Sequence, residues 1–240
     1  MLEGQKCLVI GSGISGIGAV ALLEKYHADV VLYDSSDKLT KEDLEAKLPG
    51  ESKAVCIAGE LPEEVELSIQ AAVLSPGVPT DIPLVNRMRD RGVQILGEIE
   101  LGFLAEQGRV IAITGTNGKT TTTTLTGEIM KAHFGAEKTF VVGNIGNPYT
   151  LEVTKTSKDS VTVGEISSFQ LETIHTFHPV VSAILNITPD HLNRHHTMEN
   201  YIAAKEAITM NQTKDDYCIL NYENAYTREF GEKRCPATVV

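Results

Sequence analysis

The sequence lacks the features that mark disulfide-bonded, membrane-spanning or nucleic-acid-binding proteins. None of its four cysteines forms a C-x-x-C pair, and two of them, Cys7 and Cys56, lie within apolar runs. This predicts buried free thiols in a reducing compartment, Cys218 and Cys235 included. No apolar run approaches the roughly 18 residues that a transmembrane helix needs. Basic residues are outnumbered, 21 against 32 acidic ones, for a formal net charge of −11. We therefore expect no nucleic-acid or membrane partner.

The remaining composition is that of an ordinary globular protein. The chain has 240 residues, of which 42% are hydrophobic and 22% are charged. This length accommodates one large or two modest domains, each able to bury its own core. The N-terminus enters a strand-like run almost at once and has no signal-peptide h-region. We expect a cytoplasmic protein and a monomer.

The segment 110–131 predicts a phosphate-binding loop. Its β-branched and apolar start indicates a buried strand, and the residues after position 119 have helical spacing. Between them, Gly115 and Gly118 allow successive backbone N–H groups to converge on an anion. Lys119 can reach terminal phosphates, and the Thr120 hydroxyl can hold Mg²⁺. A strand, a glycine loop and a helix N-terminus together form a nucleotide site.

This loop is tighter than the common G-x-x-x-x-G-K-[ST] pattern. Ile113 occupies the position where that pattern has its first glycine, so a G-x-x-G-K-T sequence remains. The alternative is a glycine-rich turn with an incidental lysine, which does not explain why Lys-Thr follows the second glycine directly.

A second glycine-rich turn lies near the N-terminus. A strand at 6–10 leads into GSGISG at 11–16, a helix runs to about Tyr26, and the next strand ends at Asp34. This is the spacing of a dinucleotide-binding fingerprint, with a helix N-terminus for a pyrophosphate and an acid for a ribose hydroxyl. The pattern does not decide between NAD, FAD and a UDP group.

The first 97 residues predict a doubly wound, parallel α/β sheet, which is a Rossmann-like domain. Further strands are expected at 54–58, 71–74 and 93–96, with helical segments at 41–48 and 83–91. Ser75-Pro76-Gly77 follows the fourth strand and so lies at the carboxyl edge, where ligands bind such sheets. A plain Pro-Gly turn is an equal alternative. We place the domain boundary near Gly97, giving domains 1–97 and 98–240, with a connecting helix at 98–107.

The second domain predicts a P-loop α/β fold in which polar residues follow each strand. Strands are expected at 139–142, 160–163, 180–185 and 217–220, leading to the polar segments 143–146, 164–172, 186–191 and 221–224. The carboxyl ends of parallel strands share one edge, which also carries the glycine loop, so we expect these groups to converge on one site.

Three residues of this domain suggest metal chemistry. Glu165 follows a strand and offers the oxygen ligands that Mg²⁺ prefers, with a surface glutamate as the alternative. His191 follows a strand end, where it can be a ligand or a structural hydrogen-bonder. Lys205 falls in the apolar stripe of a predicted helix at 197–210, which should push its pKa down. A neutral amine there can react with CO₂ to give a carbamate ligand, whereas a lysine that snorkels to water is the alternative.

Several motifs together resemble the Mur ligases, the cytoplasmic enzymes that build the peptide stem of peptidoglycan. GTNGKT, GNIG, GEISSFQLE, LNITPDH and the AAK ending at Lys205 occur here in the family's order. SSFQLE is especially similar to the members that add D-glutamate. The similarity covers essentially the whole chain.

This resemblance implies a role for each matching residue. It implies ATP contacts at Gly115, Thr116, Asn117, Gly118, Lys119, Thr120 and Thr121. It implies two Mg²⁺ sites, with Thr120 and Glu165 at the first, and His191 and a carbamylated Lys205 at the second. It implies catalytic roles for Lys119, Glu165, His191 and Lys205. It implies substrate contacts at Ile14, Ser15, Asp34, Ser35, Gly77, Asn144, Ser167 and His191.

The implied reaction is ATP-driven amide formation that joins D-glutamate to UDP-N-acetylmuramoyl-L-alanine through an acyl phosphate. The implied partners are therefore small molecules. Family members carry a third domain that binds the amino acid, and this chain stops at Val240, so we expect an N-terminal fragment without full activity. Two alternatives remain: an NAD-dependent oxidoreductase, suggested by GxGxxG and Asp34, and a non-catalytic nucleotide-binding module.

Overall fold

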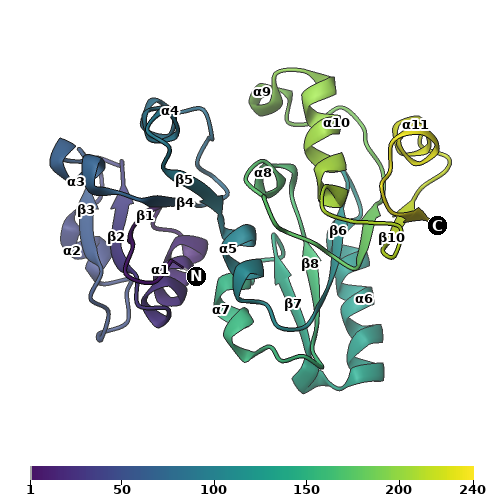
Figure 1. Cartoon of the computed structure of the whole chain (residues 1–240), viewed down its shortest axis with the longest axis horizontal. Coiled ribbons are helices and arrows are strands. Elements are labelled where there is room, and N and C mark those ends of the chain that lie inside the picture. Colours follow the sequence, from purple (N-terminus) through teal and green to yellow (C-terminus); the bar gives the residue numbers. More distant parts are fainter. Residues whose placement is uncertain (1) are drawn as a thin grey trace. The chain divides into compact units, whose positions relative to one another are not determined.

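The computed structural model describes residues 2–240, which divide into two compact units (Figure 1). Unit 1 runs to Ala105 and takes up the chain again at Pro148–Thr154. Unit 2 comprises Glu106–Asn147 and Lys155–Val240. No helix within residues 2–240 is long and apolar enough to span a bilayer.

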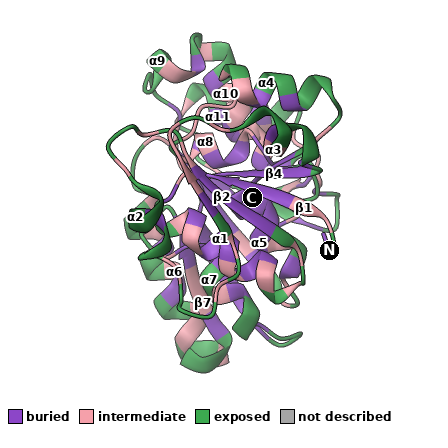
Figure 2. Cartoon of the chain, turned by 90° about the vertical axis from the view of Figure 1, so that its left-hand side faces the viewer, coloured by how far each residue is buried: buried purple, intermediate pink, exposed green. Residues whose placement is uncertain are grey.

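Unit 1 is built on a five-stranded parallel sheet with the strand order β3-β2-β1-β4-β5. Its strands are β1 (Lys6–Ile10), β2 (Asp29–Asp34), β3 (Val55–Ala58), β4 (Ala71–Leu74) and β5 (Gln94–Gly97). Four consecutive residues are buried in each of β1, β2 and β4, which Figure 2 shows in purple. Burial on both faces explains why these strands read as continuous apolar runs.

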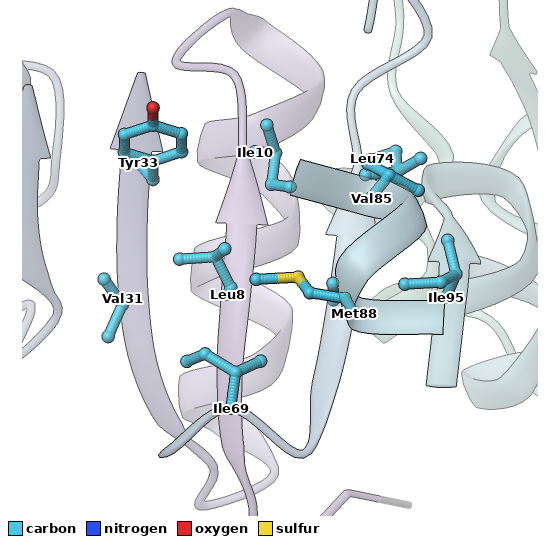
Figure 3. Close-up of a cluster of buried hydrophobic side chains, with 10 residues drawn as sticks. Leu8, Ile10, Val31, Tyr33, Ile69, Leu74, Val85, Met88 and Ile95 are labelled. Atoms are coloured by element: carbon cyan, nitrogen blue, oxygen red, sulfur yellow. The ribbon is translucent and has the colours of Figure 1, made fainter. Parts of the chain in front are cut away.

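Five helices of unit 1 alternate with its strands, and a sixth, α7, comes from later in the chain. They are α1 (Ile14–Lys25), α2 (Lys41–Glu45), α3 (Glu63–Ser68), α4 (Pro83–Asp90), α5 (Glu98–Ala105) and α7 (Tyr149–Glu152). One core cluster joins the sheet to α4 (Figure 3). Val85 and Met88 of α4 are fully buried in it, and Met88 extends over β1 towards Leu8.

Helix α5 packs within unit 1, although the sequence places the domain boundary near Gly97. Glu98 at its start is buried, and its Oε1 accepts hydrogen bonds from the Thr150 backbone N–H (2.7 Å) and hydroxyl (2.8 Å). A Cβ on Gly102 would lie 2.7 Å from the Tyr149 ring, so only glycine lets α7 approach α5 this closely. The division of the structure therefore falls after Ala105.

Unit 2 contains a six-stranded parallel sheet with the order β11-β10-β9-β6-β8-β7. Its strands are β6 (Arg109–Thr114), β7 (Thr139–Gly143), β8 (Val161–Glu165), β9 (Val181–Ile184), β10 (Tyr217–Leu220) and β11 (Thr238–Val239). The chain order reverses on either side of β6, so the carboxyl end of β6 is the topological switch point where such folds bind ligands.

The helices of unit 2 are α6 (Lys119–Phe134), α8 (Ser168–Leu171), α9 (Leu192–His195), α10 (Met198–Glu206) and α11 (Ala225–Lys233). Short 3₁₀ turns occupy Ala136–Lys138, Val153–Lys155 (which straddles the division between the units) and Ala207–Thr209. The predicted helix at 197–210 is therefore an α-helix continued by a 3₁₀ turn. The Thr197 side chain caps it by accepting from the Asn200 N–H.

The α/β prediction with a parallel sheet in each half is confirmed. Cys7, Cys56 and Cys218 are buried free thiols, whereas Cys235 is partly exposed. The sequence did not predict α3, α7, α8, α9, α11 or β11. Most of these elements are short, and β11 pairs with Tyr217 and Cys218 of β10.

Candidate functional site

The loop 115–120 connects β6 to α6 at the switch point of unit 2. Gly115 (φ +147°) and Gly118 (φ +85°) both have backbone conformations that favour glycine, and Gly118 is the N-cap of the 16-residue α6. The Lys119 ammonium folds back and donates to the carbonyls of Gly115 (3.0 Å) and Thr116 (2.9 Å). The loop thus offers a helix N-terminus and a cation at one point, which suits a phosphate.

The segment after β9 holds this loop in shape. The Asn186 side chain accepts from the Asn117 N–H (2.9 Å) and donates to the Asn117 carbonyl (3.0 Å), while the Asn186 carbonyl accepts from the Thr116 N–H (2.9 Å). The Thr116 hydroxyl accepts from the Thr188 N–H (3.0 Å). Asn186 was not among the site residues predicted from the sequence. Its position directly after a strand, at the edge that carries the loop, is the signal that could have identified it.

Lys205 of α10 is buried at 2% exposure and donates to the Gly115 carbonyl over 2.8 Å. Its Nζ also lies 4.8 Å from the centroid of the Tyr201 ring. Burial, reinforced by the charge of Lys119 and opposed by that of Asp190, lowers the pKa of Lys205 to about 7. Lys205 is thus buried and does not snorkel to water, its pKa is lowered, and the lysine faces the loop itself.

Glu165 is the last residue of β8 and is buried at 1% exposure. Its Oε1 accepts from the Asn144 amide over 2.9 Å, but its Oε2 is buried without a hydrogen-bond partner. An unpaired buried carboxylate oxygen is costly, and a bound cation would compensate it. The donor set around Glu165 therefore fits a divalent metal ion.

His191 lies in a different setting from Glu165. It adopts a left-handed backbone conformation (φ 52°) as the N-cap of α9, and about half of its side chain is exposed. Its ring packs edge-on against Phe169 with centroids 5.0 Å apart, and its Nε2 lies 3.4 Å from Asp190 Oδ2. Across residues 2–240, no three His, Cys, Asp or Glu side chains are gathered as a metal cluster.

The other predicted residues of unit 2 have mixed settings. Thr120 and Thr121 are exposed in the first turn of α6, and Asn144 is exposed in the segment after β7. Ser167 has a structural task, because it forms a capping box with Gln170 at the start of α8. The structure thus gathers Lys119 and Lys205 around the loop 115–120, and Asn144 with Glu165 at the end of β8.

In the glycine turn of unit 1, residues 11–16, the backbone of Gly16 packs closely against that of Gly11. A Cβ on Gly16 would lie 1.9 Å from the Gly11 carbonyl oxygen, so α1 can start here only with glycine. Asp34 closes the turn by accepting from the Ser12 N–H (3.0 Å), the Ser12 hydroxyl (2.7 Å) and the Ser36 N–H (3.1 Å). Burial alone would raise the pKa of Asp34, but these hydrogen bonds outweigh it, and the pKa is lowered.

A cavity of about 490 Å³ lies beside this turn at the carboxyl edge of the sheet. The predicted residues Asp34, Ser35 and Gly77 line it. The rest of its wall is Ile10, Gly11, Tyr33, Val78, Pro79, Ile82, Pro83 and Leu84. Ile14 and Ser15 instead begin α1, where Ile14 is 65% exposed. Apolar walls with a few convergent polar groups are typical of small-molecule sites.

Both units match models of one protein family. Residues 113–239 match the Mur ligase middle domain, and residues 5–97 match the N-terminal domain of MurD-like Mur ligases. The chain therefore belongs to the Mur ligase family.

Among curated proteins, the chain is similar to UDP-N-acetylmuramoylalanine–D-glutamate ligases. It is 57% identical over 239 residues to that of Lachnospira eligens, covering 100% of this chain and 52% of the relative. It is 46% identical over 240 residues to that of Clostridioides difficile, again covering 100% of this chain and 52% of the relative. The chain thus spans about half the length of the curated relatives it matches.

Solved structures show the same fold at low sequence identity. UDP-N-acetylmuramate:L-alanyl-gamma-D-glutamyl-meso-diaminopimelate ligase (MPL) from Neisseria meningitides aligns with a TM-score of 0.62 at 14% identity, covering 98% of this chain and 76% of the other. UDP-N-acetylmuramate-alanine ligase from Thermotoga maritima aligns with a TM-score of 0.55 at 20% identity, covering 98% and 53%.

The burial of Lys205 predicts a pH-dependent stability. Its folded pKa of about 7 lies below the usual lysine value of 10.5, so between these pH values the unfolded state binds the extra proton and stability rises with pH. Replacing Lys205 with Met should therefore stabilise the protein most below pH 7. This gain should shrink by an amount on the order of 4 kcal/mol towards pH 10. Urea unfolding at several pH values measures it.

The matched control is Lys233→Met, because the Lys233 side chain is 65% exposed. Its effect on the free energy of unfolding should be small and nearly independent of pH. If the change in the free energy of unfolding caused by Lys205→Met is equally independent of pH from pH 6 to pH 10, the pKa of Lys205 is not lowered by burial.

Proposed function

We propose that this chain is the nucleotide- and substrate-binding part of an ATP-dependent ligase that adds D-glutamate to UDP-N-acetylmuramoyl-L-alanine. The observation that carries the proposal is the 57% identity to such a ligase across the whole chain. The site geometry supports it, because each unit has a glycine turn at the carboxyl edge of a parallel sheet. Residues 1–97 would bind the UDP substrate and residues 98–240 would bind ATP, in a cytoplasmic, monomeric enzyme of cell-wall synthesis.

In unit 2, the loop 115–120 would hold the ATP phosphates. The N-terminus of α6 would supply N–H donors to the phosphates, because the N–H groups of Thr116 and Asn117 already donate to Asn186. Lys119 presently donates to two carbonyls of its own loop, and a γ-phosphate would give the same ammonium a charged acceptor. Thr116, Asn117 and Thr121 complete the proposed nucleotide contacts. The task of this loop is to position the phosphates and to neutralise charge as it develops.

The unpartnered Oε2 of Glu165 supports a Mg²⁺ site there, with Thr120 as a second ligand. His191 and a carbamylated Lys205 would hold a second ion. Bound Mg²⁺ would neutralise phosphate charge and orient the transferred group. The carbamate would form by attack of the neutral Lys205 amine on CO₂ with loss of one proton. The remaining N–H could still donate to the Gly115 carbonyl.

The proposed reaction has two steps. A substrate carboxylate oxygen attacks the γ-phosphorus and ADP leaves, which gives an acyl phosphate. The amine of D-glutamate then attacks the acyl carbon, phosphate leaves, and the amine loses a proton as the amide forms. Asn144 and Ser167 would lie near the muramoyl part, whereas Ile14, Ser15, Asp34, Ser35 and Gly77 would contact the uridine diphosphate.

Replacing Lys119 with Ala tests the ATP site. The variant should lose at least about tenfold in affinity for Mg-ATP, because a charge-assisted contact to phosphate is lost. Its stability should change little, since Lys119 is only partly buried. Isothermal titration calorimetry measures the affinity, and Lys131→Ala, at an exposed ion pair on α6, is the control. Equal affinity in wild type and Lys119→Ala would refute this site.

Carbamylation of Lys205 predicts a labelled carbamate carbon. With ¹³C-bicarbonate and Mg²⁺, a carbamate signal should appear in the ¹³C spectrum and should be absent in Lys205→Met. An unmodified lysine at high bicarbonate would contradict the carbamate.

An NAD-dependent oxidoreductase is the second candidate, favoured by GxGxxG and Asp34. Both Asp34 oxygens already accept from Ser12 or Ser36, which disfavours a bidentate contact to a ribose. We expect UDP, and not NADH, to shift the amide resonances of Gly13 and Asp34. Saturable NADH binding without any response to UDP would favour the oxidoreductase and overturn the ligase proposal.

A further inference from the structure

Helix α9 is a four-residue helix with an unfavourable backbone at both ends. His191 before it and His196 after it have positive φ values of 52° and 65°. Such conformations are rare for residues other than glycine and persist only where the surroundings enforce them. The contacts of α9 with neighbouring elements should therefore explain why His191 is held in this conformation.

Two side chains of α9 attach it to α8 and to the residue that follows α8. Arg194 donates to Glu172 Oε2 over 2.7 Å, and its guanidinium lies 4.8 Å from the centroid of the Phe169 ring. His195 shares a hydrogen bond between its Nε2 and Ser168 Oγ at 2.9 Å, and its Nδ1 lies 3.4 Å from Glu172 Oε1. Glu172 therefore contacts both side chains.

These contacts are largely shielded from water. The side chain of His195 is 2% exposed, and those of Arg194 and Glu172 are 14% and 16% exposed. The shielded hydrogen bond between the charged Arg194 and Glu172 side chains is therefore stronger than that of an exposed ion pair. The Asn200 amide adds a third link by donating to the His195 carbonyl over 3.0 Å, which joins α9 to α10.

The Phe169 ring connects these contacts to His191. It contacts the guanidinium of Arg194 and the ring of His195, whose centroid is 5.5 Å away, and it packs edge-on against the His191 ring. The chain of contacts thus runs from Glu172 through Arg194 and Phe169 to the imidazole of His191.

We propose that Arg194 and His195, together with Glu172 and Ser168, form a clamp that fixes the His191 imidazole in the orientation the ligase site uses. Arg194 and His195 are positioning residues, since they act through Phe169 and the backbone of α9. The inference rests on the proposed function for what His191 does, but the clamp itself rests on the contacts above.

The first readout is the imidazole signal of His191 in ¹⁵N-labelled chain 1–240, assigned with His191→Asn. Arg194→Ala and His195→Ala should shift or broaden this signal. His195→Gln should restore it, because the Gln amide nitrogen can reach Ser168 Oγ. Glu172→Gln, which keeps the shape of the side chain, should act in the same direction as Arg194→Ala and substitutes for it if that variant folds poorly.

The second readout is Mn²⁺ binding, followed by electron paramagnetic resonance with a non-hydrolysable ATP analogue present. Arg194→Ala should weaken Mn²⁺ binding about tenfold, as loss of a partner that orients a ligand does. Its affinity for ADP without metal should stay unchanged.

Arg234→Ala is the matched control. Arg234 also pairs with a glutamate, Glu206, over 2.6 Å and also lies over an aromatic ring, that of Phe230 at 5.8 Å. Arg234→Ala should change neither the His191 imidazole signal nor Mn²⁺ binding. If Arg194 has a purely structural role, Arg194→Ala and Arg234→Ala should both alter stability and neither of these two measurements. An unchanged His191 signal in Arg194→Ala and Glu172→Gln would overturn the clamp. Failure of the wild-type chain to bind nucleotide would instead refute the proposed function, and the imidazole signal would still decide the clamp.

Discussion

Two lysines donate to a single carbonyl oxygen, that of Gly115, and the organisation of the unit 2 site depends on this shared acceptor. Lys119 comes from the loop itself and Lys205 from α10, far away in the sequence. Burial lowers the pKa of Lys205, and repulsion from the Lys119 ammonium lowers it further. The loop holds Lys119 on backbone carbonyl oxygens, and an incoming phosphate would give that ammonium a negatively charged acceptor instead.

The two units hold their glycine turns in place with different side chains. In each, glycines shape a turn at the carboxyl edge of a parallel sheet, and a polar side chain from the neighbouring strand holds that turn. Asp34 serves this purpose in unit 1 and Asn186 in unit 2. A carboxylate accepts only, whereas an amide both accepts and donates, so Asn186 can bind both polar groups of the Asn117 backbone.

The sequence was sufficient for the sheets and for the two glycine turns because these depend on local patterns. Apolar runs predicted the strands, and the glycine spacings predicted both turns. The apolar stripe around Lys205 left burial and snorkelling open, and in the structure the side chain is buried. Contacts between segments that are distant in the sequence could not be predicted from such local patterns. Asn186, the partner of Asn117, gave no signal beyond its place after a strand, and the pairing of His195 with Ser168 depends on how α8 and α9 pack. The extent of α5 within unit 1 also depended on a distant partner, Thr150.

The return of residues 148–154 to unit 1 has a consequence for synthesis on the ribosome. Tyr149 packs against α5 at Gly102, and Thr150 binds the buried Glu98. Unit 1 therefore cannot complete its packing when residue 105 emerges, since its last helix follows β6, α6 and β7 of unit 2. Until that helix has been synthesised, the surface of α5 around Gly102 lacks the Tyr149 ring that covers it in the folded protein. Folding of the first unit is thereby tied to the synthesis of the second, and the two do not mature strictly in sequence order.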